Sequence, residues 1–336
     1  MSLEAHPFAK FVAILGRGKT KSRALTLEEA REAMAMILRG EALPEQIGAF
    51  LMLLRLKEET PEEIAGFTLG TRATIALPAA IPDVDLDWSS YAGKRIQLPW
   101  FLLSVLTLAG AGIRVFMHGT EGHTPGRVYT SDVLRRLGLA PAQSLAEAAD
   151  HIRARNFAYV PLEVLSPVLR HLIELRPILG LRSPVHSFSR MLNPFGAPAM
   201  MQGIFHRGFM DIHAGAGRLL GQPHMAVFRG EGGEIERRPN KPTVVWTTHG
   251  AAEPEIETWP AILADPHQPA DSAMDPADLV AVWRGERTSA YGEAAVTGTL
   301  AVALKLLGRA DTIPAAQALA ERMWADRDRD GLPAAA

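Results

Sequence analysis

The sequence predicts an α/β protein that begins with a small all-α domain, and three observations lead to this fold class. Helix-capping residues and helical periodicity fill residues 1–75, short apolar runs of β type alternate with helical stretches from residue 76 onward, and about the last fifty residues return to helix. At 336 residues the chain is long enough for two domains. We therefore expect a helical domain at residues 1–75 and an α/β domain at residues 76–336.

Three helices have clear start signals in the N-terminal domain. Thr26 is placed to cap a helix whose Glu29 stands three residues further on, and Gly40 follows the end of its apolar stripe. The next helix begins at Pro44, and Thr60 with a proline and two glutamates after it opens another. These signals predict three or four short helices, in a domain that also carries a basic loop.

The α/β domain has five candidate strands. They are residues 95–98, 113–117, 158–161, 225–228 and 243–246. Ser144 caps a predicted helix between the second and third strands, an apolar helix over residues 294–307 is expected to cross the core, and Pro314 begins a terminal helix. We expect part of residues 160–195 to pack with the helical domain.

Composition excludes several classes of protein. The chain is 47% hydrophobic and 21% charged, with a formal charge of -2, which is typical of an ordinary globular protein and names no partner by itself. It has no cysteine, which excludes disulfides, thiolate metal sites and cysteine nucleophiles. The apolar residues 98–113 are interrupted by Pro99 and Gly110 and indicate a core helix, not a membrane span. We expect a cytoplasmic protein with no membrane partner.

A basic segment near the start is the first candidate binding site. It places five cations in fourteen residues without an acid among them: Lys10, Arg17, Lys19, Lys21 and Arg23. Gly16 and Gly18 would let the backbone approach a ligand, so a loop that binds phosphate and an ordinary solvated loop are both open. Nine arginines against five acids between residues 127 and 190 also indicate local polarisation of charge.

Acidic residues offer the only candidate metal ligands. Glu231, Glu234 and Glu236 lie in the segment GEGGEIERR after a predicted strand, where carboxylates could hold Mg²⁺. A solvated turn is the alternative interpretation, and composition favours it. The close histidine pairs lack neighbouring carboxylates in the sequence, and no phosphate-loop, nucleophile-elbow or zinc-helix motif occurs.

Several sequence motifs, taken together, resemble those of the anthranilate phosphoribosyltransferase family, glycosyltransferase family 3, and its nucleoside-phosphorylase relatives. The resemblance covers essentially the whole chain and implies a nucleoside phosphorylase/phosphoribosyltransferase-like architecture. The phrases that carry it are Met117-His118-Gly119-Thr120, Ser131-Asp132-Val133-Leu134 with Leu137-Gly138, and Arg176-Pro177-Ile178-Leu179-Gly180-Leu181-Arg182-Ser183 followed by Asn193-Pro194.

The departures from this family fall where its chemistry takes place. Where the family has the diphosphate loop Gly-Thr-Gly-Gly-Asp, this chain reads DWSSYAGK at residues 87–94, and bulky side chains replace glycines that let the backbone reach a ligand. Met117 replaces the family's lysine, and Glu234-Ile235 stands where the family has a metal-binding Asp-Glu pair. A phosphoribosyl diphosphate site of the usual form is therefore not expected.

The segment Gly16-Arg17-Gly18-Lys19 with Ser22-Arg23 resembles a divergent YbiB-type branch of the family. That branch is understood to keep the fold and to bind nucleic acids through positive charge on a dimer. The resemblance implies a homodimer, formed through the helical domain at residues 1–75, that binds the backbone of DNA or RNA without sequence preference. For this function we expect no cofactor. Lys10, Arg17, Lys19, Lys21 and Arg23 are then the expected contacts.

Two other functions remain open. The resemblance also allows an active pentosyltransferase that uses phosphoribosyl diphosphate and Mg²⁺, in which Arg176 would hold the acceptor carboxylate and Glu231 and Glu234 would bind the metal. The residual cleft would then consist of His118, Gly119, Thr120, Arg176 and Asn193. A third possibility is a small-molecule binder or a transferase of altered specificity that uses the same cleft.

Overall fold

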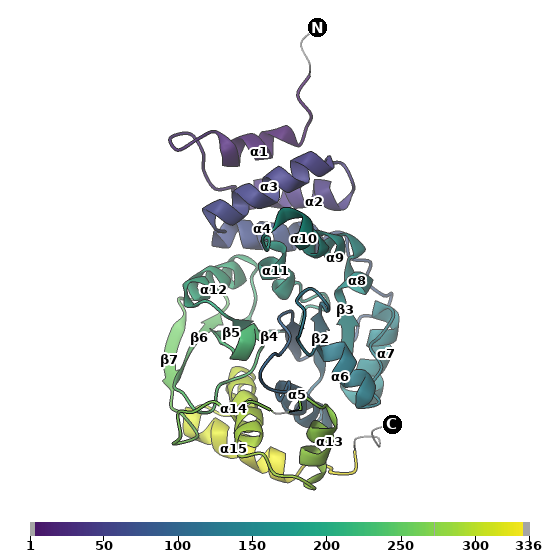
Figure 1. Ribbon diagram of the computed structural model, residues 1–336, viewed down its shortest axis with the longest axis vertical. Coiled ribbons are helices and arrows are strands. Elements are labelled where there is room, and N and C mark those ends of the chain that lie inside the picture. The colour runs from purple at the N-terminus through teal and green to yellow at the C-terminus, as the bar shows by residue number, and fades with distance from the viewer. Residues whose placement is uncertain (1–3, 272, 332–336) are drawn as a thin grey trace.

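The molecule has three layers along its long axis: an N-terminal helical layer, a seven-stranded sheet and a C-terminal group of helices (Figure 1). The computed structural model describes residues 4–271 and 273–331. Helix α1 lies at one end of the molecule, and α15 lies at the opposite end. The predicted fold class, α/β with a small N-terminal helical domain, is confirmed.

The helical layer contains α1 (Ala9–Gly16), α2 (Leu27–Leu38), α3 (Pro44–Lys57) and α4 (Pro61–Arg72). Both predicted capping boxes are present, because the hydroxyls of Thr26 and Thr60 accept hydrogen bonds from the backbone N–H groups of Glu29 and Glu63. Helices α2 and α4 approach closely at Gly66, where a Cβ atom would lie 2.3 Å from the carbonyl oxygen of Leu27. Glycine at this position therefore sets how tightly the layer packs.

The sheet has the strand order β3-β2-β1-β4-β5-β6-β7. Strands β1 to β5 pair in parallel, whereas β6 and β7 are antiparallel additions at one edge. The strands are β1 (Leu86–Ser90), β2 (Val115–Gly119), β3 (Phe157–Pro161), β4 (Ala199–Ile204), β5 (His224–Arg229), β6 (Thr243–His249) and β7 (Glu255–Trp259). The carboxyl ends of the parallel strands point towards one edge, where ligands bind in open α/β sheets.

Helices cover both faces of the sheet. They are α5 (Phe101–Gly110), α6 (Thr130–Arg136), α7 (Leu145–Arg155), α8 (Leu162–Leu165), α9 (Pro167–Glu174), α10 (Arg176–Leu179), α11 (Val185–Phe188), α12 (Met210–Leu219), α13 (Ala277–Arg284), α14 (Ala290–Leu306) and α15 (Ile313–Ala325), with short 3-10 helices at Ser189–Met191, Arg207–Phe209 and Glu231–Gly233. The apolar stretch at residues 98–113 contains α5, which is buried beneath the sheet. No helix in the described part of the chain is long and apolar enough to span a membrane.

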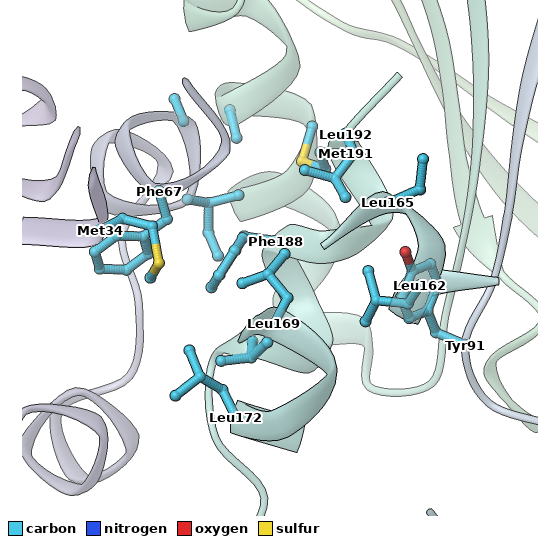
Figure 2. Close-up of a cluster of buried hydrophobic side chains, with 14 of the residues drawn as sticks. Met34, Phe67, Tyr91, Leu162, Leu165, Leu169, Leu172, Phe188, Met191 and Leu192 are labelled. Carbon is cyan, nitrogen blue, oxygen red and sulfur yellow. The ribbon is translucent and has the colours of Figure 1, made fainter. Parts of the chain in front are cut away.

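One hydrophobic cluster continues from the helical layer into the α/β part (Figure 2). Phe67 of α4 contacts Phe188 of α11, with ring centroids 5.4 Å apart. At the end of α4, the Arg72 guanidinium donates hydrogen bonds of 2.7 Å and 2.9 Å to the carbonyl oxygens of Leu192 and Met191. A second cluster fills the other face of the sheet beneath α5, α14 and α15.

The strand predictions were partly wrong. Residues 95–98 form an irregular loop, and the first strand lies earlier, over Leu86–Ser90. Its polar sequence LDWSS does not have an apolar pattern, yet all five residues are buried because β2 and β4 flank the strand on both sides. Strands β4 and β7 were also missed. β4 reads AMMQGI, which contains few residues that favour strands in isolation.

Candidate functional site

The candidate site lies where the carboxyl ends of β1, β2, β4 and β5 meet. Four segments follow these strands: residues 91–94, 120–127, 205–209 and 230–236. Strand β1 is in the middle of this group, so the loop after it faces segments that are far away in sequence. Its position corresponds to the edge at which ligands bind in open α/β folds.

The loop after β1 holds a carboxylate of the protein itself. The backbone N–H groups of Ala92 and Gly93 each donate a hydrogen bond of 2.6 Å to Oε1 of Glu234. Gly93 has a φ of 69°, a left-handed conformation that favours glycine. Successive backbone N–H groups of this kind form an anion-binding concavity. Here the anion is Glu234, whose side chain is completely buried.

A second buried carboxylate, that of Glu236, accepts hydrogen bonds from donors next to this loop. Lys94 Nζ lies 2.5 Å from Oε1 of Glu236, and the N–H of Phe101, the first residue of α5, donates to Oε2 of the same side chain at 2.9 Å. Burial raises the pKa of Glu236, and the charge of Lys94 opposes that shift. The loop amides, the lysine and the first N–H of α5 are thus all paired inside the molecule.

The predicted metal ligands do not form a metal site. Glu231 pairs with Arg238 at 2.7 Å, and Glu234 accepts the two loop N–H groups. Among residues 4–271 and 273–331, no group of three or more His, Asp or Glu side chains could hold a metal ion. Ile235, fully buried, offers no second carboxylate beside Glu234. The residues present therefore do not fit Mg²⁺, and the interpretation of Glu231, Glu234 and Glu236 as a solvated turn is also wrong, because all three are buried.

The predicted cleft residues at the end of β2 are bonded within the protein. His118 Nδ1 lies 2.8 Å from the hydroxyl of Tyr91, and its Nε2 lies 3.4 Å from Asp87 Oδ2. His118 thus has a carboxylate neighbour that its sequence surroundings did not indicate. Gly119 lies so close to β1 that a Cβ atom would be 2.0 Å from the carbonyl oxygen of Ser90.

Two further predicted residues have structural partners. The hydroxyl of Thr120 accepts a hydrogen bond of 2.7 Å from Arg170. Asn193 is buried, and its side chain bonds both the N–H and the carbonyl of Ala197, which closes the turn before β4. These contacts account for both residues without a ligand.

Three arginines gather at the mouth of the cleft, and within the described residues none of the three has a carboxylate partner. Arg176 donates to the carbonyl of His123 and to the hydroxyl of Thr124, which also accepts from Arg182. Arg190, a residue that the motif comparison did not single out, lies behind them and donates to the carbonyls of Gly203 and Gly233. Such a cluster attracts anions. The density of arginine between residues 127 and 190 was the one available signal for it.

Two histidines lie near these arginines: His186 is buried, and His123 is partly buried. Burial and the nearby positive charges lower the pKa of His123 to about 4 and the pKa of His186 to about 3. Both are therefore neutral at pH 7, and the positive charge at this mouth comes from the arginines alone.

The basic segment near the start divides into paired and unpaired cations. Lys10 contacts Glu32 at 2.8 Å, and Arg23 holds Glu29 through two hydrogen bonds of 2.6 Å and 2.7 Å. The remaining three, Arg17, Lys19 and Lys21, are exposed and have no ion-pair partner in the described part of the chain. We call the segment from residue 16 to residue 23 the basic loop.

Comparisons with known proteins agree with this architecture. A family profile described as "Glycosyl transferase family, helical bundle domain" matches residues 12–74. The chain is 30% identical over 317 residues to an anthranilate phosphoribosyltransferase of Moorella thermoacetica, covering 88% of this chain and 89% of that protein. Two solved structures have a similar fold. Anthranilate phosphoribosyltransferase from Thermus thermophilus has a TM-score of 0.78 at 22% identity, with coverage of 96% and 95%. The Saccharomyces cerevisiae protein in complex with PRPP and Mg has a TM-score of 0.77 at 15% identity, with coverage of 96% and 94%.

Proposed function

The chain belongs to the anthranilate phosphoribosyltransferase family, and from this premise we propose that it binds the phosphate backbone of nucleic acids in place of phosphoribosyl diphosphate. One observation carries the proposal: Glu234 occupies the backbone N–H groups of Ala92 and Gly93. A diphosphate would have to displace a buried carboxylate from these donors and leave it without them. That exchange is unfavourable, because an unpaired buried charge costs several kcal/mol.

The basic loop supplies positive charge that is not paired with a carboxylate, unlike Lys94 in the cleft, which pairs with Glu236. Arg17, Lys19 and Lys21 are exposed and unpaired among the described residues, so phosphates can reach them without breaking an internal ion pair. Gly18 has a φ of 87°, which turns the backbone between them. We further propose a homodimer formed through the helical layer, in which two copies of the basic loop double the charge. Contacts of this kind give affinity without sequence preference.

The test is fluorescence anisotropy of a labelled oligothymidylate, and of an RNA of the same length, over a series of salt concentrations. We expect binding whose logarithm falls linearly with the logarithm of salt concentration. Replacing Arg17, Lys19 and Lys21 by Glu should weaken binding by about tenfold or more and lower the salt slope by about 2, since each lost single-strand contact contributes about 0.7.

The matched control carries the same change of charge elsewhere. Arg136 of α6, Arg309 after α14 and Arg322 of α15 are exposed and lie on elements outside the helical layer. Their replacement by Glu should leave affinity near that of the wild type. Equal loss in both triple variants would indicate a general charge effect and would contradict the basic loop as the site. Absence of binding by the wild-type protein at low salt would overturn the proposal.

Pentosyl transfer is the second candidate, and the comparisons favour it over nucleic-acid binding. The relatives described above carry the name anthranilate phosphoribosyltransferase, and the arginine cluster at Arg176 and Arg182 could hold the carboxylate of an acceptor. Catalysis would then consist of positioning the acceptor and stabilising the departing diphosphate.

A turnover assay with phosphoribosyl diphosphate, Mg²⁺ and anthranilate separates the two candidates. We expect no product, and no heat of binding for phosphoribosyl diphosphate in calorimetry. Product that disappears in an Arg176→Ala variant and persists in the triple variant of the basic loop would establish the second candidate instead.

A further inference from the structure

A groove of about 280 Å³ opens beside β5 and β6, outside the cleft described above. The residues that line it include four cations and an aromatic side chain: Arg207, Arg229, Arg238, Lys241 and Trp246. They come from the 3-10 helix before α12, the end of β5, the segment before β6 and β6 itself. Four cations in one small groove are notable in a chain whose formal charge is -2.

Most of this charge has no internal counterion. Arg238 pairs with Glu231 at 2.7 Å. Arg207 and Lys241 are exposed, and no carboxylate in the described ranges pairs with either of them. Arg229 donates to a neutral partner, the carbonyl oxygen of Phe205, at 3.1 Å. An anion entering the groove would therefore meet three cations that need not give up an ion pair with any described residue.

The cations also act on one another. Burial lowers the pKa of Arg229, the positive charges of Arg238 and Arg207 lower it further, and the carboxylate of Glu231 opposes these effects. Like charges held this close repel, and a bound anion relieves that repulsion. With four cations and the one carboxylate of Glu231 paired to Arg238, the groove has an excess of positive charge that favours an anion.

Aromatic surface borders the same cations. Trp246 is only partly buried, whereas the other five tryptophans are buried, each at most 6% exposed (Trp88, Trp100, Trp259, Trp283 and Trp324). Phe205 is 48% exposed, and the Arg229 guanidinium lies 5.8 Å from the centre of its ring. Cations that follow a backbone and aromatic rings on which bases stack are the two features that bind single-stranded nucleic acid.

We infer that this groove binds a segment of single-stranded nucleic acid, with phosphates against Arg207, Arg229 and Lys241 and a base stacked on Trp246. The inference rests on the proposed function and adds to it a second contact surface, distinct from the basic loop. Stacking needs an unpaired base, so the groove favours single strands over duplexes. Free phosphate could pair with the cations, but it has no aromatic ring that could stack on Trp246.

Tryptophan fluorescence tests the stacking directly. Unlabelled oligothymidylate added to the wild-type protein should quench part of the emission, because Trp246 lines the groove and is the least buried of the six tryptophans. In Trp246→Phe the quenching should disappear while anisotropy still reports binding. In the control Trp324→Phe, which removes a buried tryptophan of α15, quenching should persist. Inorganic phosphate should not quench the wild-type protein.

The outcomes distinguish this inference from the proposed function. Binding by anisotropy without quenching, or equal quenching in Trp246→Phe, overturns the groove and leaves the basic loop standing. A wild-type protein that binds no oligonucleotide overturns both.

A charge variant gives a second readout. Arg207→Glu combined with Lys241→Glu should weaken binding by about tenfold and lower the salt slope by about 1.4. The matched pair Arg136→Glu with Arg322→Glu should do neither. An affinity and slope equal to those of the wild type in the groove variant would overturn the inference.

Discussion

The cleft after β1 and the groove beside β6 both contain clustered charged groups, but the two sites differ in whether those groups are paired within the protein. In the cleft, Lys94 and the loop amides are paired with Glu236 and Glu234, so these groups leave no free charge for a ligand. In the groove, Arg207, Arg229 and Lys241 lack carboxylate partners within the described residues. Charges that are paired and buried act as structural elements. Charges that remain unpaired are available for binding, and in this chain the groove beside β6 has three of them among the described residues.

The largest expected effect comes from breaking the buried pair in the cleft. Lys94→Met leaves the Glu236 carboxylate buried without its partner, and the free energy of unfolding should fall by about 3–5 kcal/mol. Urea denaturation measures the loss. Adding Glu236→Gln should recover part of it, because the remaining amide carries no charge. The exposed pair of Arg39 and Glu41 provides the control, and Arg39→Met should unfold close to the wild type. If Lys94→Met has the same urea midpoint as the wild type, the pair of Lys94 and Glu236 does not stabilise the fold.

Removing the carboxylate from the loop gives the next largest effect. Glu234→Ala leaves the N–H groups of Ala92 and Gly93 without an acceptor, and we expect a loss of about 1–3 kcal/mol. Pyrophosphate should raise the melting temperature of this variant by occupying the vacated donors, and it should not raise that of the wild type. Glu234→Gln, which keeps an acceptor oxygen, should respond weakly. If the wild type and the variant respond equally to pyrophosphate, Glu234 does not block the loop.

Acid should destabilise the protein through its buried histidines. Burial lowers the pKa of His186 and of His213 from 6.5 to about 3. Between these values the unfolded chain binds protons that the folded chain does not, so stability falls as pH falls from about 6.5, by up to about 1.4 kcal/mol per pH unit for each histidine. Urea midpoints at several pH values measure this slope. The double variant His186→Gln with His213→Asn should reduce the slope, and His123, whose pKa is lowered to about 4, should account for part of what remains. A slope equal to that of the wild type would show that other groups cause the acid sensitivity.

The smallest effect on stability is expected at the surface charges. Lys19→Gln with Lys21→Gln breaks no internal ion pair with a described residue, so the melting temperature should equal that of the wild type while oligonucleotide affinity falls. Together with Lys94→Met this variant sharpens the contrast, since one change affects stability and the other affects binding. A clear drop in melting temperature would mean that the basic loop has a structural role.

Local signals were enough to predict much of the fold. The helix starts at Thr26, Thr60 and Ser144 were predicted correctly because the capping residue and its partner are three residues apart. Strand β1 was missed because its burial depends on β2 and β4, which local patterns do not describe.

The site depended on contacts that no local pattern contains. The departures at residues 91–94 and at Glu234 were each visible in the sequence. The sequence could not show that the loop N–H groups donate to the Glu234 carboxylate, because Gly93 and Glu234 are 141 residues apart. The five basic residues are close together in the sequence, but only the structure separates Lys10 and Arg23, which have acidic partners, from the other three.

The Arg72 guanidinium, which donates to the carbonyls of Leu192 and Met191, has a mechanical consequence. A rigid-body movement of the helical layer away from the sheet would break these hydrogen bonds and separate Phe67 from Phe188. It would also expose buried apolar side chains of the shared cluster to water. The two parts of the chain therefore lack a free hinge, and helical layer and sheet should lose amide protection together, as one cooperative unit, when the protein unfolds.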